Sequence, residues 1–175
     1  MSVLVQDLLT LSRGGERAST ATPVSLPMLT HDVVIRLLPL ANDHTVHLVE
    51  GASVEDLFVF VNQEEVSRAV VNIIKNAILY NRPGGSVTVS LAKKGSQAEL
   101  TIQDTGIGMT PEEVSHAFDR FYRAEQSRSR ETGGSGLGLS IAKSVVEAAS
   151  GSLSLVSTKE KGTTVTILLP IHIAS

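Results

Sequence analysis

Asn72 and Asn76 are the side chains in this sequence whose type and spacing first suggest chemistry. They lie in residues 64–81, a stretch whose apolar residues recur at helical spacing, so the two amides share one helix face. Amide oxygens are hard ligands, and Mg²⁺ accepts one such oxygen together with phosphate oxygens and waters. A plainer interpretation is that both amides bond only to neighbouring backbone or to water. We favour a magnesium–phosphate site because matching signals follow downstream.

A carboxylate at the end of a strand-like run is the first of these signals. Asp104 follows the alternating residues 97–103 and precedes Gly106 and Gly108. A carboxylate is a strong acceptor for the exocyclic amine of adenine, and the glycines would let the backbone pass close to the base. The alternative is a tight turn capped by Asp104, but the asparagine pair upstream favours an adenine pocket. Tyr80 either stacks on the base or packs in the core, and the residues alone do not decide.

A glycine-rich run at 133–139 is the second signal, because it leads into a predicted helix over residues 137–149. The start of a helix offers unpaired N–H groups and the positive end of the helix dipole, and both suit phosphates. A dinucleotide-binding turn is a poor alternative, since no strand–helix–strand unit precedes the run and no acidic residue follows on a second strand. The candidate phosphate-binding residues of this run are Gly134, Gly136, Leu137 and Gly138.

Helices and strands must position these residues, and the hydrophobic periodicity predicts them along most of the chain. Helices are predicted at 27–42, 64–81, from 111 and 137–149, and strands at 46–49, 56–61, 86–93, 97–103, 152–157 and 163–169. Pro39 should end or kink the first helix. Strands mixed with long helices predict an α/β (α+β) sandwich, in which helices pack on one face of a mixed, largely antiparallel sheet.

The composition excludes several classes of protein. The chain has 175 residues, enough for one domain with a full core, and no segment approaches the ~18 uninterrupted apolar residues of a membrane span. The absence of cysteine excludes disulfides and thiolate metal sites, and residues 1–11 lack the positive segment of a secretory signal. A formal net charge of −3 and an aromatic content of 3% argue against nucleic-acid binding.

Four motifs stand in a fixed order: the asparagine helix at 64–81, the Asp-Thr-Gly-Ile-Gly-Met run at 104–109, the Phe-Asp-Arg-Phe box at 118–121 and the glycine run at 133–139. In this order they resemble the ATP-binding catalytic domain of bacterial two-component sensor histidine kinases, in the superfamily that also holds DNA gyrase and the heat-shock chaperone ATPases. One short glycine motif matches by chance, but four in order are specific. The resemblance covers about residues 20–170 and implies the Bergerat ATP-binding fold.

The resemblance assigns roles that the residues alone leave open. Asn76 would ligate Mg²⁺, and Asn72 would act in catalysis by holding a bound water or the metal's shell. Asp104 would accept the hydrogen bond of the adenine amine. Many members of the family carry Lys or Arg three residues after the second asparagine, where this chain has Leu79, and this departure weakens the expected grip on phosphate.

The resemblance also implies an ATP lid at about 118–135. Phe118 and Phe121 would anchor it, with Phe121 against the nucleotide, and the charge, Ser and Gly of residues 123–135 predict a mobile loop. Arg128 lies closest to the family's lid arginine and would contact the γ-phosphate, for which the guanidinium fork is suited.

The domain division and the function follow from the same resemblance. Residues 1–21 would be the tail of a dimerisation-domain helix with a linker, and residues 22–175 the catalytic domain. The chain would bind ATP and Mg²⁺ and deliver the γ-phosphoryl group to a histidine on a dimerisation domain that it lacks, for two-component signal transduction through a response regulator. The full-length protein would be a membrane-anchored homodimer with this domain in the cytoplasm.

Two alternatives are open at this point. The first is an anti-sigma-factor-type serine kinase of the same superfamily, whose members usually lack the Phe-x-x-Phe box. The second is a nucleotide-binding regulatory module without transfer activity. His31 is followed by an acidic residue as in a phosphoacceptor, but the basic residue and the proline that should follow are wrongly spaced. We therefore expect this chain alone to bind ATP without phosphorylating itself.

Overall fold

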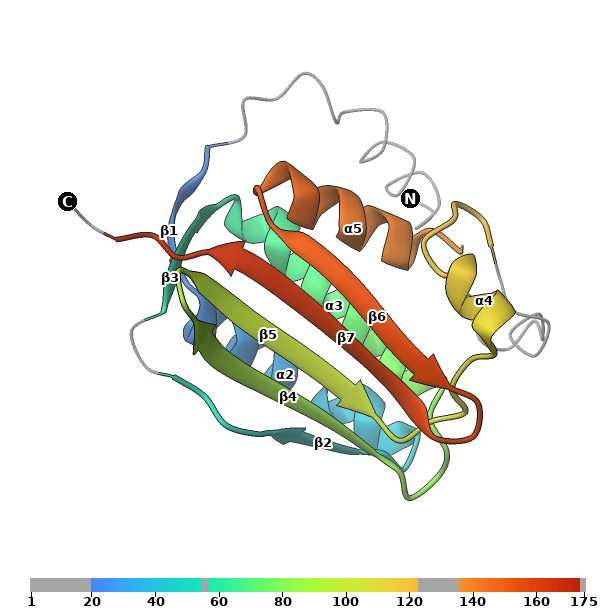
Figure 1. Cartoon of the computed structure of the whole chain (residues 1–175). Helices are drawn as coiled ribbons and strands as arrows, with labels where there is room; N and C mark the ends of the chain where they lie inside the picture. Colours follow the sequence, from blue (N-terminus) through green and yellow to red (C-terminus); the bar gives the residue numbers. More distant parts are fainter. Residues whose placement is uncertain (1–19, 55–56, 123–135, 174–175) are drawn as a thin grey trace, which may run out of the picture.

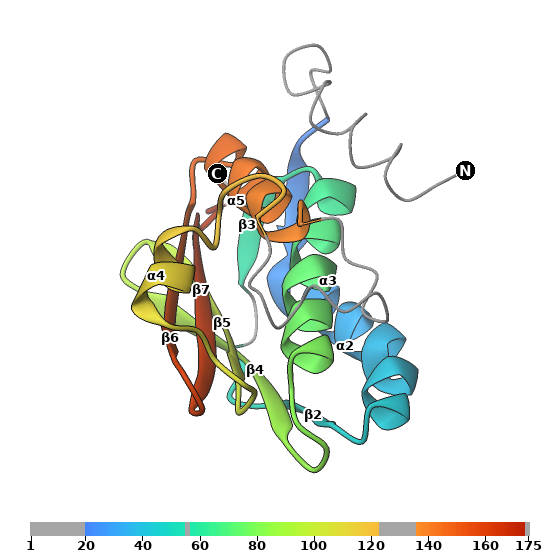
Figure 2. The ribbon, with the colours of Figure 1, turned by 90° about the vertical axis from the view of Figure 1, so that its right-hand side faces the viewer.

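The computed structural model describes residues 20–54, 57–122 and 136–173, which form a sheet with helices behind it (Figure 1). The elements are β1 (Thr22–Ser25), α2 (Leu26–Asp43), β2 (His47–Glu50), β3 (Phe58–Val61), α3 (Gln63–Leu79), β4 (Ser86–Lys94), β5 (Gln97–Asp104), α4 (Pro111–Ser115), α5 (Gly138–Ala148), β6 (Ser152–Thr158) and β7 (Gly162–Pro170). Figure 2, turned by 90°, shows the layers edge-on, with α2 and α3 on one side of β4, β5, β7 and β6. These layers position the site described below.

The larger sheet has five strands in the order β2-β4-β5-β7-β6. The β2–β4 pair is parallel, and the β4–β5, β5–β7 and β6–β7 pairs are antiparallel. Alternate side chains of β4, β5 and β7 are buried beneath the helices, which is why these strands read as alternating apolar and polar residues. The predicted sandwich of a mixed, largely antiparallel sheet with helices on one face is confirmed.

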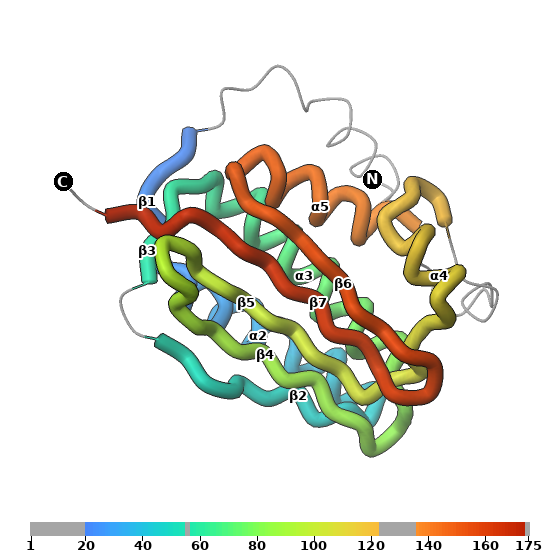
Figure 3. Tube along the Cα trace, in the orientation of Figure 1, coloured from blue at the N-terminus to red at the C-terminus, as the bar shows by residue number. Residues whose placement is uncertain are grey.

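A second, two-stranded sheet pairs β1 with β3 and was not predicted from the sequence. Four residues that include Pro23 give a weak strand signal, because proline has no N–H to donate. Val24 and Val59 on its inner face are buried. Figure 3 shows β1 and β3 beside the end of β7, where Val59 bridges Ile171, so the small sheet closes that end of the core.

The central helix α3 packs against both α2 and α5. The Glu65 N–H donates to the side chain of Asn62 at 3.0 Å, which caps the start of the helix. Its buried face consists of Val66, Ala69, Val70, Ile73, Ile74, Ala77 and Ile78. Asn72 and Asn76 are half-buried at the margin of this face, so their amides are held on a rigid helix without being enclosed in the core.

Pro39 was predicted to end or kink this helix. It lies inside α2, which continues to Asp43, so the helix does not end there. The proline removes one N–H and crowds the preceding turn, but Leu37 and Ala41 on either side of it are buried and hold the last turn against the core. Within the residues that the structure describes, no helix is both long enough and apolar enough to cross a membrane.

The β4–β5 hairpin carries Asp104 to the end of the sheet that lies beside the C-terminal end of α3. In the strand register Asp104 is opposite Val87 of β4, and Gln103 is opposite Thr164 of β7. The chain after Asp104 then passes between the end of α3 and the turn that joins β6 to β7. The sheet register thus places Asp104 and the loop after it beside Tyr80 at the end of α3.

Candidate functional site

The C-terminal end of α3 and the loop after β5 are joined through their backbones. The Ile107 N–H donates to the carbonyl oxygen of Tyr80 at 3.0 Å. Gly106 is buried so closely under the same carbonyl that an added Cβ would collide with it. Tyr80 ends α3, and its side chain is half-buried. We refer to Tyr80, the loop 104–110 and the β6–β7 turn at 158–162 as the adenine end, after the base predicted there.

Asp104 uses one carboxylate oxygen to hold the adenine end together. Its Oδ1 accepts hydrogen bonds from the Gly106 N–H at 2.8 Å and the Thr163 N–H at 3.2 Å. Within the described residues, Oδ2 receives no hydrogen bond. Burial raises the pKa of the Asp104 carboxyl, and the two N–H donors act against that rise. The side chain caps its turn, as the plainer alternative predicted, and contact of Oδ2 with an adenine amine stays a prediction.

Position 108 requires glycine because its backbone lies against another part of the protein. Its φ of +59° is in the left-handed region, and an added Cβ would collide with the carbonyl oxygen of Thr158. The close neighbours of Gly106 are likewise backbone atoms of Tyr80 and Asn81. These contacts account for glycine at both positions, and an approach of this backbone to the base stays a prediction.

The asparagine pair lies beside the start of α5. The Asn72 Nδ2 donates to the carbonyl oxygen of Gly138 at 3.5 Å, and a Cβ added at Gly138 would lie 3.7 Å from the Asn72 Cβ. The Asn76 side chain is half-buried and makes no hydrogen bond to the residues that the structure describes. We refer to Asn72, Asn76 and residues 136–140 as the phosphate end. The structure thus brings the asparagine helix beside Gly138, in the described part of the glycine run.

The start of α5 has no side-chain cap within the described residues, and its N-cap residue is Leu137. The Leu137 side chain is 0% exposed, so this residue would contact phosphate only through its main chain. Gly136 has a φ of +71° and lies against the backbone of Phe121 and Tyr122. The positive end of the α5 dipole therefore lies beside the Asn72 side chain.

The two phenylalanines of the 118–121 box lie differently. Phe118 packs against the core, and the Lys143 ammonium lies 5.0 Å from the centroid of its ring. The Phe121 side chain is 60% exposed, but its N–H donates to the carbonyl oxygen of Gly136 at 3.0 Å. Phe118 is thus held by its ring and Phe121 by its backbone, and their anchoring of the lid and the contact of Phe121 with nucleotide stay predictions. Arg128 and Gly134 lie outside the described residues.

The phosphate end offers an amide oxygen to a cation, which suits a hard cation whose other ligands are phosphate and water oxygens. In residues 20–54, 57–122 and 136–173 no three His, Cys, Asp or Glu side chains gather as a metal cage. A cation beside Asn76 would take one amide oxygen from the protein and its remaining ligands from phosphate and water, which is how Mg²⁺ is commonly bound. The residues present therefore fit Mg²⁺.

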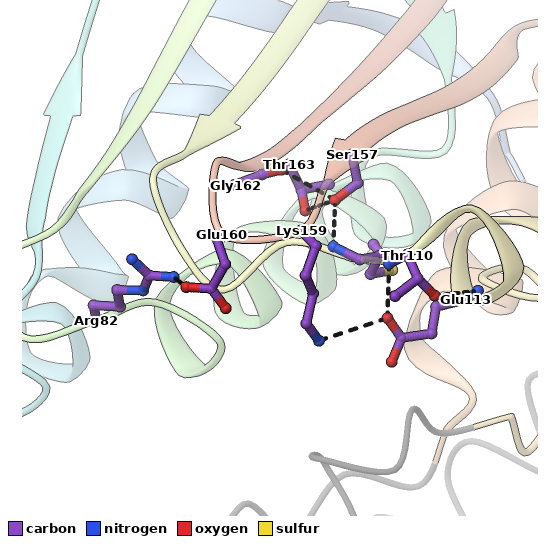
Figure 4. A network of polar contacts seen from close by, with 9 residues as sticks. Arg82, Thr110, Glu113, Ser157, Lys159, Glu160, Gly162 and Thr163 are labelled. Atoms are coloured by element: carbon purple, nitrogen blue, oxygen red, sulfur yellow. Dashed lines mark hydrogen bonds and ion pairs between the residues drawn. The ribbon is translucent and has the colours of Figure 1, made fainter.

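A polar network on the β6–β7 turn was missed by the sequence analysis (Figure 4). The Met109 N–H donates to the Ser157 hydroxyl at 2.8 Å, and that hydroxyl also contacts Thr163. A signal for it existed: Leu153 and Leu155 point inward from β6, and Ser157 takes the next inward position, where a polar side chain requires partners.

Comparisons with known proteins agree with the four motifs and the fold. The sequence profile of the family described as "Histidine kinase-, DNA gyrase B-, and HSP90-like ATPase" matches residues 61–173. The sensor histidine kinase RppB of Synechocystis is 40% identical over 174 residues, which are 98% of this chain and 38% of RppB. The chain thus spans well under half of that relative.

Solved structures give the same result. A mycobacterial sensor histidine kinase, MprB, is 30% identical with a TM-score of 0.74, and the match covers 87% of this chain and 98% of that one. Full-length ShkA, solved in complex with AMPPNP, is 20% identical with a TM-score of 0.84, covering 98% of this chain and 36% of ShkA. At 20% identity, the match to ShkA shows that the fold is shared and nothing further.

Proposed function

This chain belongs to the family of histidine kinase-, DNA gyrase B- and HSP90-like ATPases, and we propose that it presents Mg-ATP to a phosphoacceptor histidine outside its own sequence. ATP binding follows from the family itself. The relatives named above are sensor histidine kinases, which supports that kind of whole protein over an anti-sigma-factor-type serine kinase. The Phe118–Phe121 box favours the same choice.

The observation that carries the proposal is that the two carboxylate oxygens of Asp104 have different partners. Oδ1 is occupied by two backbone N–H groups, while Oδ2 has no donor among the described residues. Asp104 is half-buried, so a ligand that brings an amine to Oδ2 gains a partly shielded, charge-assisted hydrogen bond that no described residue supplies. We propose that this amine is the exocyclic amine of adenine and that the half-buried Tyr80 ring lies alongside the base.

At the phosphate end we propose that the Asn76 amide oxygen is the protein's ligand to Mg²⁺ and that Asn72 orients the metal's shell. Bound Mg²⁺ would neutralise charge on the phosphate oxygens. The backbone of residues 136–138 and the start of α5 would contact the phosphates. The protein's contribution is then to position and neutralise, which is the main requirement of phosphoryl transfer. Arg128 and Gly134 keep the roles predicted from the sequence, although they lie outside the described residues.

The wider assembly is also a proposal. Residues 1–21 would lead from a dimerisation domain, residues 22–175 would be the catalytic domain, and the whole protein would be a membrane-anchored homodimer that phosphorylates a response regulator. His31, on α2, is exposed, and its Nδ1 lies 2.9 Å from Oε1 of Glu50 on β2. Neither its sequence context nor this contact marks it as a phosphoacceptor, so the chain alone should bind ATP without becoming phosphorylated.

Isothermal titration calorimetry with ATP, with and without Mg²⁺, tests the proposal. The wild-type chain should bind ATP with a one-to-one stoichiometry, more tightly with Mg²⁺ than in EDTA, and more tightly than GTP. Chain incubated with labelled Mg-ATP should gain no acid-labile phosphate. Absence of ATP binding by the folded chain, or stoichiometric phosphate on His31, would contradict the proposal.

A further inference from the structure

The β6–β7 turn holds the loop after β5 at three points that surround the proposed adenine contact. The Thr163 N–H donates to Asp104 Oδ1 at 3.2 Å, and the Glu160 N–H donates to the Ile107 carbonyl oxygen at 2.8 Å. The Met109 N–H donates to the Ser157 hydroxyl at 2.8 Å. Among these contacts, only the last uses a side chain of β6 or β7, so it is the one that a substitution in these strands can remove.

Figure 4 shows the Ser157 side chain beside Gly162 and Thr163. It is opposite Thr163 in the strand register, on the inward face of the sheet. Its Oγ lies 2.8 Å from the Met109 nitrogen, 3.0 Å from the Gly162 carbonyl oxygen and 2.8 Å from Thr163 Oγ1. One half-buried hydroxyl therefore joins the loop that carries Asp104 to both ends of the β6–β7 turn.

The chemistry of these partners fixes the direction of the hydrogen bonds. A serine hydroxyl has one proton and two lone pairs. The Gly162 carbonyl can only accept and the Met109 N–H can only donate, so Ser157 gives its proton to Gly162 and one lone pair to Met109. Its second lone pair is then available for the Thr163 hydroxyl, which must be the donor for all three contacts to exist together. Thr163 is left with lone pairs and no proton for any further partner.

We propose that Ser157 is a positioning residue that sets the preference of this site for adenine, an inference that rests on the ATP binding proposed above. It fixes the loop that follows Asp104, and it is bonded to Thr163, whose N–H holds Asp104 Oδ1. Adenine presents an amine donor where guanine presents a carbonyl oxygen. A carboxylate whose Oδ1 is fixed in this way and whose Oδ2 can only accept favours adenine and disfavours guanine.

The experiment measures ATP and GTP affinities of the full chain by calorimetry for the wild type and Ser157→Ala. Loss of the hydroxyl should weaken ATP binding roughly three- to tenfold, the effect of one hydrogen bond, and should weaken GTP binding much less. Ser157→Thr keeps a hydroxyl and should stay close to the wild type. Ser154→Ala is the matched control, because Ser154 lies on the same strand but is exposed on its other face.

The comparison of two nucleotides separates positioning from mere structural support. Equal losses for ATP and GTP, or wild-type affinity and preference in Ser157→Ala, would overturn the proposal for Ser157 while leaving ATP binding intact. If Ser157→Ala does not fold, Ser157→Cys decides, since it keeps the side-chain size and only weak hydrogen bonding, and the same loss of preference is expected. A folded wild-type chain that binds no ATP would overturn both proposals.

Discussion

The adenine end and the phosphate end of this site are built in different ways. At the adenine end, backbone N–H groups of the loop and the β6–β7 turn are bonded to Tyr80, Asp104 and Ser157 at 2.8–3.2 Å. At the phosphate end, the Ser140 hydroxyl donates to the Leu137 carbonyl oxygen at 2.9 Å and the Asn72 amide lies 3.5 Å from that of Gly138, but within the described residues no side chain bonds the N–H groups at the start of α5. The described part of the chain therefore fixes the base-binding region in advance and leaves the phosphate-binding groups for a ligand.

This difference has a physical reason. Recognition of a neutral base depends on the direction of a few hydrogen bonds, so a rigid arrangement lowers the entropy lost on binding. A triphosphate with its cation supplies its own charge and many oxygen ligands, so the protein needs only to leave donors and an amide oxygen available. Half-buried groups such as Asn76 can bond to water until the ligand arrives, which limits the cost of leaving them without a protein partner.

The largest effect is expected at the phosphate end. Asn76→Ala should weaken binding of Mg-ATP by roughly a hundredfold, because an interaction with a charged partner is lost. The weakening should shrink in EDTA, since Asn76 acts through the cation. Titration calorimetry in both buffers measures it, and Asn42→Ala, an exposed asparagine in α2, is the control. Affinity like that of the wild type with Mg²⁺ would remove Asn76 from the cation site.

The next effect tests the adenine end. Asp104→Asn keeps an oxygen that can accept from Gly106 and Thr163, so the fold should be retained. The amide would present its NH₂ group where Oδ2 accepts, and ATP affinity should fall roughly tenfold with loss of the preference over GTP. Asp43→Asn, at the exposed end of α2, is the matched control. An unchanged ratio of ATP to GTP affinity would reduce Asp104 to a turn residue.

The pH dependence of stability sharpens the same contrast. Burial raises the pKa of Asp104 in the folded state above its ordinary value of about 3.9. Below that value both states are protonated. As the pH rises, the unfolded state ionises first, so the stability of the wild type relative to Asp104→Asn should fall until the pH passes the raised folded-state pKa, and then level off. Urea unfolding at a series of pH values measures this, and a relative stability that rises with pH would contradict the burial of the carboxyl.

The smallest effect concerns Leu79, which is half-buried on the same side of α3 as the asparagines. Leu79→Lys adds a cation where the triphosphate is proposed to lie and should tighten ATP binding by roughly two- to fivefold at low salt, with the gain disappearing at high salt. Met28→Lys, at a position that is 69% exposed in α2, controls for net charge. A loss of affinity, or a gain equal to that of the control, would place the phosphates elsewhere.

Much of this fold could be predicted because each long element carries a clear periodicity. The helical spacing of residues 64–81 and the alternation of residues 97–103 predicted α3 and β5, and both are present in the structure. By contrast, β1 was missed, since its four residues pair with a strand more than thirty positions away and the pairing leaves no local pattern.

The site was predicted less completely, for a related reason. Asn72, Asn76 and Asp104 have residue types that point to chemistry by themselves. The bonds that position the adenine end come from β6 and β7, and a serine or threonine in a strand gives little sign of its partner. Ser157 meets Met109 only after the sheet has formed, 48 positions apart in the chain. The glycines at 106 and 108 had a visible signal, but the structure shows that the nearest atoms are protein backbone.

The measurement that tests the contrast most directly is hydrogen–deuterium exchange of the chain with and without Mg-ATP. The amides of Gly106, Ile107 and Met109 should be protected before the nucleotide is added and change little, because their hydrogen bonds already exist. Amides at residues 138–140, at the start of α5, should gain the most protection among the described residues when Mg-ATP binds. Fast exchange of those three loop amides in the apo protein, or a gain confined to that loop, would contradict a site whose adenine end is prepared in advance and whose phosphate end is completed by the ligand.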